Sequence, residues 1–109
     1  GAGEGLDHAT VRARWPESYA DGAINPRVTP PGGESMTTFC TRVLDFLTEV
    51  VACPARVPIY VITHNGWIRT AKLVNGDVGP EELFATPEPF LEPIPFMPRT
   101  DLWCNPFSP

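Results

Sequence analysis

The chain has 109 residues, of which 42% are hydrophobic and 19% charged, a composition that suits a small folded domain or part of one and excludes a disordered polar chain. Its 13 acidic and 8 basic residues give a formal net charge of −5, and the basic residues form no stripe, so we expect no nucleic acid partner. The three cysteines lack the spacing of a disulfide framework or a zinc site, and we expect neither a metal nor a cofactor.

The first predicted elements are a short helix and a long loop. Asp7 can cap a helix that runs to about Trp15, before Pro16. Residues 20–33 are rich in glycine, proline and asparagine and show no sustained period, which predicts a surface loop.

The clearest helix follows this loop. Ser35 is in position to cap it, and we expect it to end near Ala52. Apolar residues recur at steps of three and four along it and form one face that needs a covering layer; they are Met36, Phe39, Cys40, Val43, Leu47, Val50 and Val51.

Residues 57–63 are apolar on both parities and rich in β-branched side chains, which predicts a strand of parallel type buried on both faces. A second helix should follow and stop at Asn75-Gly76, and Pro80 should begin a further short helix. Because helix, buried strand and helix alternate, we predict an α/β fold.

Prolines interrupt the chain after residue 86, so residues 90–96 can form at most an edge strand. We expect residues 1–97 to belong to the domain and residues 98–109 to form an irregular proline-rich tail. Leu102, Trp103 and Phe107 are apolar enough that we expect this tail to pack back on the domain or on a partner.

The candidate site lies where the predicted strand meets the next helix. His64 occupies the carboxyl end of the strand, which is where open α/β sheets bind their ligands. The backbone amides of Asn65, Gly66 and Trp67 would point from the helix start toward an anion, and Gly66 would permit a close approach. The sequence therefore predicts an oxyanion site at His64, Asn65 and Gly66.

Three short motifs resemble those of the histidine phosphatase (phosphoglycerate-mutase-like) superfamily. Residues 63–69, Thr-His-Asn-Gly-Trp-Ile-Arg, resemble its second histidine motif, and residues 31–35, Pro-Gly-Gly-Glu-Ser, resemble its Gly-Glu-Ser element. Residues 4–6 and the helix after them resemble its Glu-Gly segment. The three occur in the order of the family, from residue 3 to about residue 96.

This resemblance implies a three-layer α/β/α fold and the hydrolysis or transfer of a phosphomonoester through a phosphohistidine. In the family a first histidine, in an Arg-His-Gly motif, attacks phosphorus, a glutamate protonates the leaving oxygen, and the second histidine stabilises the phosphoryl group. His64 matches the second histidine. Arg27 lies in the segment that forms the pocket rim in the family and is a candidate ligand for a substrate anion.

The sequence departs from the family pattern because it contains no Arg-His-Gly. The other histidine, His8, is expected at the surface of the first helix, and Glu34 is more typical of helix stabilisation than of an acid catalyst. Arg69 favours an ion pair over ligand binding. We therefore expect the nucleophile and the acid in a segment that precedes Gly1 or in a partner chain.

Two other interpretations stay open at this point. The chain could be an inactive module that binds phosphate or protein, or a piece that completes the fold of a partner chain. The expected ligand is a phosphorylated small molecule or other phosphoester, and whether the chain itself acts as an enzyme is undecided. Without a leader or an apolar run of about 18 residues, we expect a cytoplasmic location and no contact with a membrane.

Overall fold

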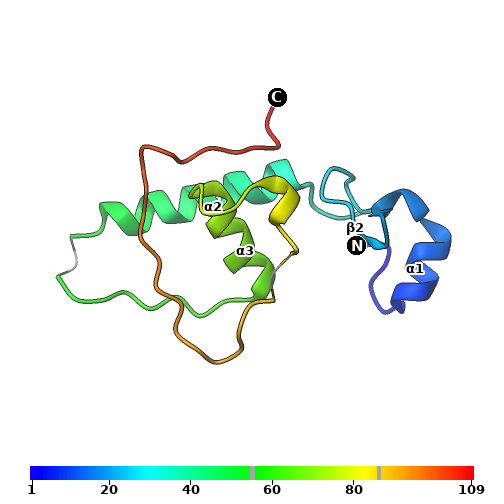
Figure 1. Cartoon of the computed structure of the whole chain (residues 1–109), viewed down its shortest axis with the longest axis horizontal. Helices are drawn as coiled ribbons and strands as arrows, with labels where there is room; N and C mark the ends of the chain where they lie inside the picture. Colours follow the sequence, from blue (N-terminus) through cyan, green and yellow to red (C-terminus); the bar gives the residue numbers. More distant parts are fainter. Residues whose placement is uncertain (55, 86) are drawn as a thin grey trace. The chain divides into compact units, whose positions relative to one another are not determined.

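The computed structural model describes residues 1–54, 56–85 and 87–109, and these fall into two compact units, residues 1–39 and 40–109. Its elements are three α-helices, two 3₁₀ turns and one two-stranded sheet in the described part of the chain (Figure 1).

The first unit begins with helix α1, His8–Arg14. As predicted, Asp7 caps this helix, because its Oδ1 accepts a hydrogen bond of 2.7 Å from the amide of Thr10. The accepted hydrogen bonds also stabilise the carboxylate and lower the pKa of Asp7. A 3₁₀ turn, Pro16–Ser18, follows the helix.

The predicted loop at residues 20–33 contains a small hairpin that the sequence interpretation missed. Strands β1, Tyr19–Ala20, and β2, Ala23–Ile24, pair antiparallel. Between them Asp21 and Gly22 have φ values of 51° and 79°, the left-handed conformation that the tight turn of a hairpin requires. The Asp-Gly pair was the available signal, and it was outweighed by the lack of any longer alternating pattern.

Helix α2, Met36–Ala52, has the predicted limits and the predicted cap. The Oγ of Ser35 accepts a hydrogen bond of 3.1 Å from the amide of Thr38. In the second unit its apolar face buries Cys40, Val43 and Leu47, whereas Val51 near its end is 45% exposed. The face is therefore covered along its middle and open at its end.

Helix α3, Asn65–Val74, is the best packed element of the second unit and buries Thr70, Ala71, Leu73 and Val74. The edge of the Trp67 ring meets Phe46 of α2, with centroids 5.5 Å apart. The helix ends where the sequence predicted. The amide of Gly76, which has φ of 78°, donates to the carbonyl of Leu73, and the amide of Asp77 donates to that of Lys72. These two hydrogen bonds form a Schellman cap.

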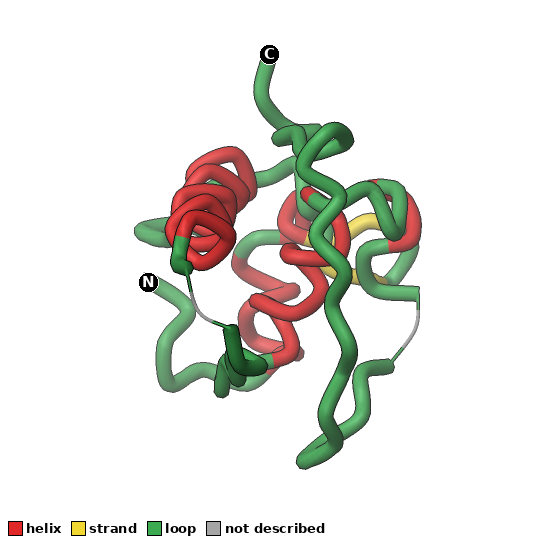
Figure 2. Tube along the Cα trace, turned by 90° about the vertical axis from the view of Figure 1, so that its left-hand side faces the viewer, coloured by secondary structure: helices red, strands yellow, loops and turns green. Residues whose placement is uncertain are grey.

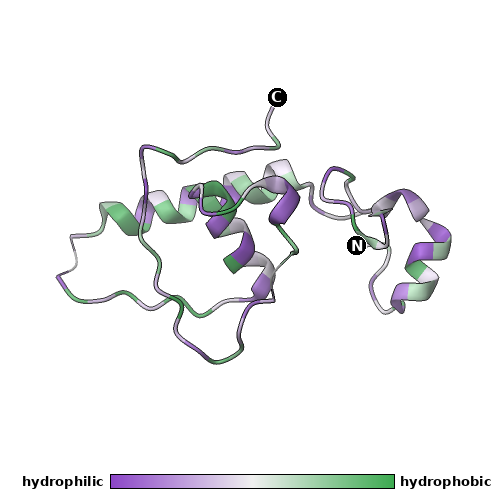
Figure 3. Ribbon diagram, viewed as in Figure 1, coloured by the Kyte–Doolittle hydropathy of each residue, from purple (hydrophilic) through white to green (hydrophobic). Residues whose placement is uncertain are grey.

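The predicted buried strand is not present. Residues 57–63 form no strand, and their apolar side chains are exposed, for example Tyr60 at 80% and Ile62 at 100%. Figure 3 shows this hydrophobic stretch leading into α3, and Figure 2 shows strands only in the β1–β2 hairpin of the described chain. A strand can be buried only when neighbouring strands bond its backbone, and the described residues of this unit offer no such neighbour.

The chain after α3 contains the 3₁₀ turn Pro80–Glu82, which begins at the predicted proline. From residue 87 onward the described chain has no regular element, in keeping with its prolines. Part of the tail nevertheless packs on the second unit as expected, since Trp103 donates to Asn75 and Leu102 contacts Gly76. The division into residues 1–97 and a tail from residue 98 stays a prediction.

Candidate active site

His64 is the residue that immediately precedes α3, and it is exposed. Its backbone is extended, with φ of −109° and ψ of 159°, and its carbonyl accepts the first hydrogen bond of the helix, 3.1 Å from the amide of Ile68. Its imidazole does not cap the helix. The predicted juxtaposition of an imidazole and a helix start is present, although residues 57–63, which lead into it, do not form the expected strand.

The amides of Asn65, Gly66 and Trp67 form the amino-terminal end of α3. The first amides of a helix have no carbonyl partner within it, and no side chain caps them here. The first turn contains no acidic residue. The partial positive charge of the helix end is therefore available to an anion despite the net charge of −5.

Gly66 leaves open space at this helix end. A Cβ placed on this residue would meet no other atom within 4 Å. Behind it, the Oγ1 of Thr70 donates to the carbonyl of Gly66 at 2.8 Å, and Trp67 is held by Phe46. The first turn of α3 is thus fixed on its buried side and accessible on the side of the glycine.

Arg27 belongs to the first unit and is exposed. Its amide donates to Oδ1 of Asn25 at 3.0 Å, which shapes the turn that contains it. The proposed role of its side chain in holding a substrate anion stays a prediction. Of the sequence-predicted ligands, His64, Asn65 and Gly66 are adjacent at one helix end.

The other residues considered from the sequence are His8, Glu34 and Arg69, and the structure shows where each one lies. His8 is exposed, and its Nδ1 lies 3.5 Å from the hydroxyl of Tyr19. Glu34 is exposed just before α2. Arg69 differs from the expected ion-pair partner, because its guanidinium donates to the carbonyl of Leu83 at 3.0 Å and lies over the ring of Phe84.

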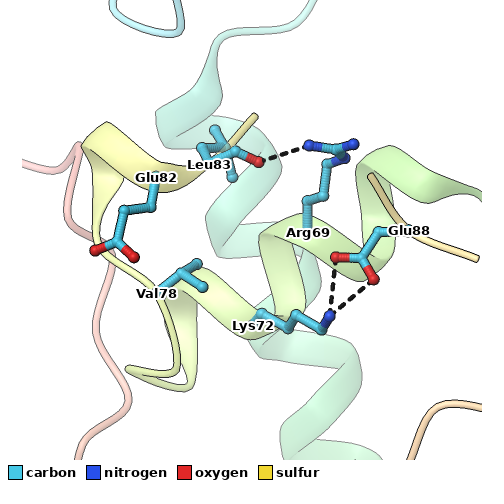
Figure 4. A pocket seen from close by; sticks show the side chains of 6 residues that line it. All are labelled: Arg69, Lys72, Val78, Glu82, Leu83 and Glu88. Atoms are coloured by element: carbon cyan, nitrogen blue, oxygen red, sulfur yellow. Dashed lines mark hydrogen bonds and ion pairs between the residues drawn. The ribbon is translucent and has the colours of Figure 1, made fainter. Parts of the chain in front are cut away.

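A pocket beside α3 was not predicted from the sequence. A pocket of about 140 Å³ lies beside α3 and is lined by Arg69, Lys72, Val78, Glu82, Leu83 and Glu88 (Figure 4). Lys72 contacts both carboxylate oxygens of the buried Glu88 at 2.8 Å. The only sequence signal for this pocket was the spacing of Arg69 and Lys72, two cations three residues apart on one helix. Lys72 is paired with Glu88 and Arg69 is hydrogen-bonded to a carbonyl, so both cations of the pocket already have partners. The Lys72–Glu88 ion pair holds residue 88 on α3.

The comparison with known families decides what this helix end belongs to. The model of the histidine phosphatase superfamily, branch 1, matches residues 1–86. The chain belongs to the histidine phosphatase superfamily. Neither the curated proteins nor the solved structures gave a significant match.

Membership in the histidine phosphatase superfamily confirms the resemblance seen in the motifs and is consistent with the α/β class. The matched range includes both His64 and the Gly-Glu-Ser-like element at residues 32–35. It places the chain in a phosphatase and mutase type of family. Separately, helix length and hydropathy give no candidate for a membrane span in the described residues.

Proposed function

We propose that the chain forms the phosphoryl-holding part of a phosphomonoesterase or phosphomutase that works through a phosphohistidine. His64 donates a hydrogen bond to a non-bridging phosphoryl oxygen, and the amides of Asn65 and Gly66 donate to the same group. The nucleophilic histidine and the acid come from polypeptide outside these 109 residues. The observation that carries the proposal is the exposed imidazole beside an uncapped helix start in a chain of this superfamily.

The chemistry fits what this helix end provides. During transfer the phosphoryl group carries negative charge on its equatorial oxygens, and catalysis depends on donors positioned where that charge lies. A helix start supplies such donors without a cationic side chain. An imidazole adds one donor that is strongest when protonated, a form that the bound anion favours.

The extended segment at residues 57–63 supports the proposal that other polypeptide completes the site. It forms no strand with the described part of the chain, and its apolar side chains, including Val57 at 71% and Ile62 at 100%, are exposed directly before His64. A strand added alongside would bury these side chains and satisfy the backbone. If it runs parallel to residues 57–63, such a strand also brings its own carboxyl end beside His64, where a nucleophile is needed.

The test is hydrolysis of p-nitrophenyl phosphate by the complete gene product. We expect His64→Ala to lower kcat/KM by about 10²–10³, the loss typical of removing one donor to a developing oxyanion. His8→Ala is the matched control, because it removes the other imidazole of the chain and should leave kcat/KM within about twofold. Unchanged activity in His64→Ala would refute the proposed role.

A second function is favoured by the sequence itself, since it holds two histidines and no Arg-His-Gly motif. The chain would then bind phosphate or a phosphorylated partner without turning it over. The same experiment separates the two functions. Binding of inorganic phosphate that depends on His64, in a complete gene product without hydrolytic activity, would identify the binding module and exclude the enzyme.

A further inference from the structure

The tail of the second unit contacts helices α2 and α3 near two cysteines, Cys40 on α2 and Cys104 in the tail itself. The amide of Cys104 donates to the carbonyl of Val74 at the end of α3, at 3.2 Å. The next residue, Asn105, donates from Nδ2 to Oγ1 of Thr41 on α2, at 3.1 Å. The residues that follow Cys40 and Cys104 are therefore hydrogen-bonded to each other, and Figure 1 shows the tail passing along α2.

The two thiols differ in a way that suits sequential oxidation. Cys40 is completely buried, whereas Cys104 is exposed. Burial, with a smaller contribution from the charge of nearby Cys104, raises the pKa of the Cys40 thiol to about 11. Cys104 is thus the thiol that a reagent in solution meets first, and Cys40 is a slow nucleophile close to it.

The third cysteine provides an internal control. Cys53 is exposed and lies just beyond the end of α2, 13 residues after Cys40. At about 1.5 Å per residue the helix places it roughly 20 Å away along its axis. It can react with a reagent, but this separation from Cys40 exceeds the reach of a disulfide.

We propose that Cys40 and Cys104 form a redox modification site, at which a small disulfide such as oxidised glutathione joins the tail to α2. The thiolate of Cys104 attacks one sulfur of the oxidant, forms a mixed disulfide and releases one glutathione thiolate. The thiolate of Cys40 then attacks the sulfur of Cys104, forms the protein disulfide and releases the second glutathione. Two electrons and two protons leave the protein, and one oxidant molecule becomes two thiols.

This inference does not depend on the proposed phosphatase function, because it uses no residue near His64. Its consequence is a covalent tie between the start of α2 and the tail, which closes a loop that contains all of α3. This disulfide would reduce the conformational entropy of the unfolded chain. The oxidised form should therefore melt at a temperature about 5 °C or more above that of the reduced form. Oxidation therefore fixes the tail over the core of the second unit.

The test treats the reduced 109-residue chain with oxidised glutathione, traps it with N-ethylmaleimide and maps the peptides by mass spectrometry. We expect a peptide pair that joins Cys40 to Cys104, with Cys53 alkylated or glutathionylated. Cys53→Ser should still form the pair, and Cys104→Ser should form none. Between pH 7 and 9 we expect the closing step to accelerate about tenfold per pH unit, because Cys40 must ionise first.

Two results would overturn the inference. A stable glutathione adduct on Cys104 that never resolves would show that Cys40 cannot reach it. Loss of the intramolecular disulfide in Cys53→Ser would show that Cys53 is the partner. A dithiothreitol-treated sample distinguishes a disulfide from irreversible oxidation and restores the lower melting temperature if the account is correct.

Discussion

The two ends of helix α3 have opposite designs. At its start His64 and Gly66 are exposed, no side chain caps the amides, and residues 57–63 form no strand with the described chain. At its end Asn75 is completely buried and Gly76 completes a hydrogen-bonded cap. In the proposed function the unsatisfied donors at one end bind a ligand, whereas the satisfied groups at the other end stabilise the fold. Under this proposal one helix serves both roles, each at its own end.

The largest effect on stability should come from the buried end. Asn75 donates to Asp77 and to the carbonyl of Met97, and its Oδ1 accepts from the amide of Arg99 and the indole of Trp103. Asn75→Ala removes all four hydrogen bonds, and although Asp77 keeps its ion pair with Arg99, we expect the free energy of unfolding to fall by about 3 kcal/mol. Urea denaturation monitored by tryptophan fluorescence measures it.

The matched control for Asn75→Ala is Asn65→Ala at the open end of the helix. It should change the free energy of unfolding by no more than about 0.5 kcal/mol, because Asn65 is only half-buried and holds no such network. Equal losses in the two variants would contradict the contrast between the ends.

The ion pair beside the helix should have the next largest effect. The side chain of Glu88 is 6% exposed and that of Lys72 is 29% exposed. Lys72→Met leaves the carboxylate without its cation and should cost about 2 kcal/mol in chemical denaturation, less than for a fully buried pair because water reaches the lysine. Adding Glu88→Leu should recover most of the loss. A double variant as unstable as the single one would argue against an unpaired charge as the cause.

The two glycines of this region should respond in opposite directions. Gly76 has φ of 78°, and an added Cβ would lie 3.4 Å from Cβ of Leu102, so Gly76→Ala should destabilise the unit by about 1 kcal/mol. Gly66 is helical and open, so Gly66→Ala should stabilise the helix by about 0.5 kcal/mol. Melting curves of both variants test the signs, and a loss in Gly66→Ala would contradict the open geometry.

The smallest effect concerns the cap of α1 in the first unit. The pKa of Asp7 is held below its usual 3.8, chiefly by the hydrogen bond from Thr10. The stability that the ionised Asp7 cap contributes is therefore present above pH 3.8, and it is lost as the pH falls through the lower pKa of Asp7 in the folded state. The amide shift of Thr10 should report this titration, whereas Asp7→Asn should keep the cap and show no pH dependence. A Thr10 shift that titrates equally in Asp7→Asn would exclude this cause.

Local signals in the sequence were sufficient for the helices. The limits of α2 followed from its apolar period and from Ser35, and the end of α3 followed from Asn75-Gly76. The Asp21-Gly22 turn was a local signal too, but it stood within a segment whose composition favoured a loop. Features governed by neighbouring residues were thus readable, even where one was missed.

Features that depend on distant residues could not be predicted. The apolar run at residues 57–63 indicated a buried strand, yet burial requires neighbouring strands that no local pattern supplies. The hydrogen bonds from Asn75 to the tail span 24 to 28 residues, and no local sequence pattern near Asn75 predicts them. For the site, the motif around His64 predicted the exposed helix start, whereas the pocket beside Lys72 needed the fold to bring Glu88 to α3.

We propose that His64 and the first amides of α3 bind an oxyanion. A titration of the 109-residue chain with inorganic phosphate tests this binding most directly. The ring resonances of His64 and the amide of Gly66 should shift and saturate at millimolar phosphate, while those of His8 follow a chloride control of equal ionic strength. If the His64 ring stays unmoved, or moves only as the His8 ring does, the oxyanion site does not exist in this chain.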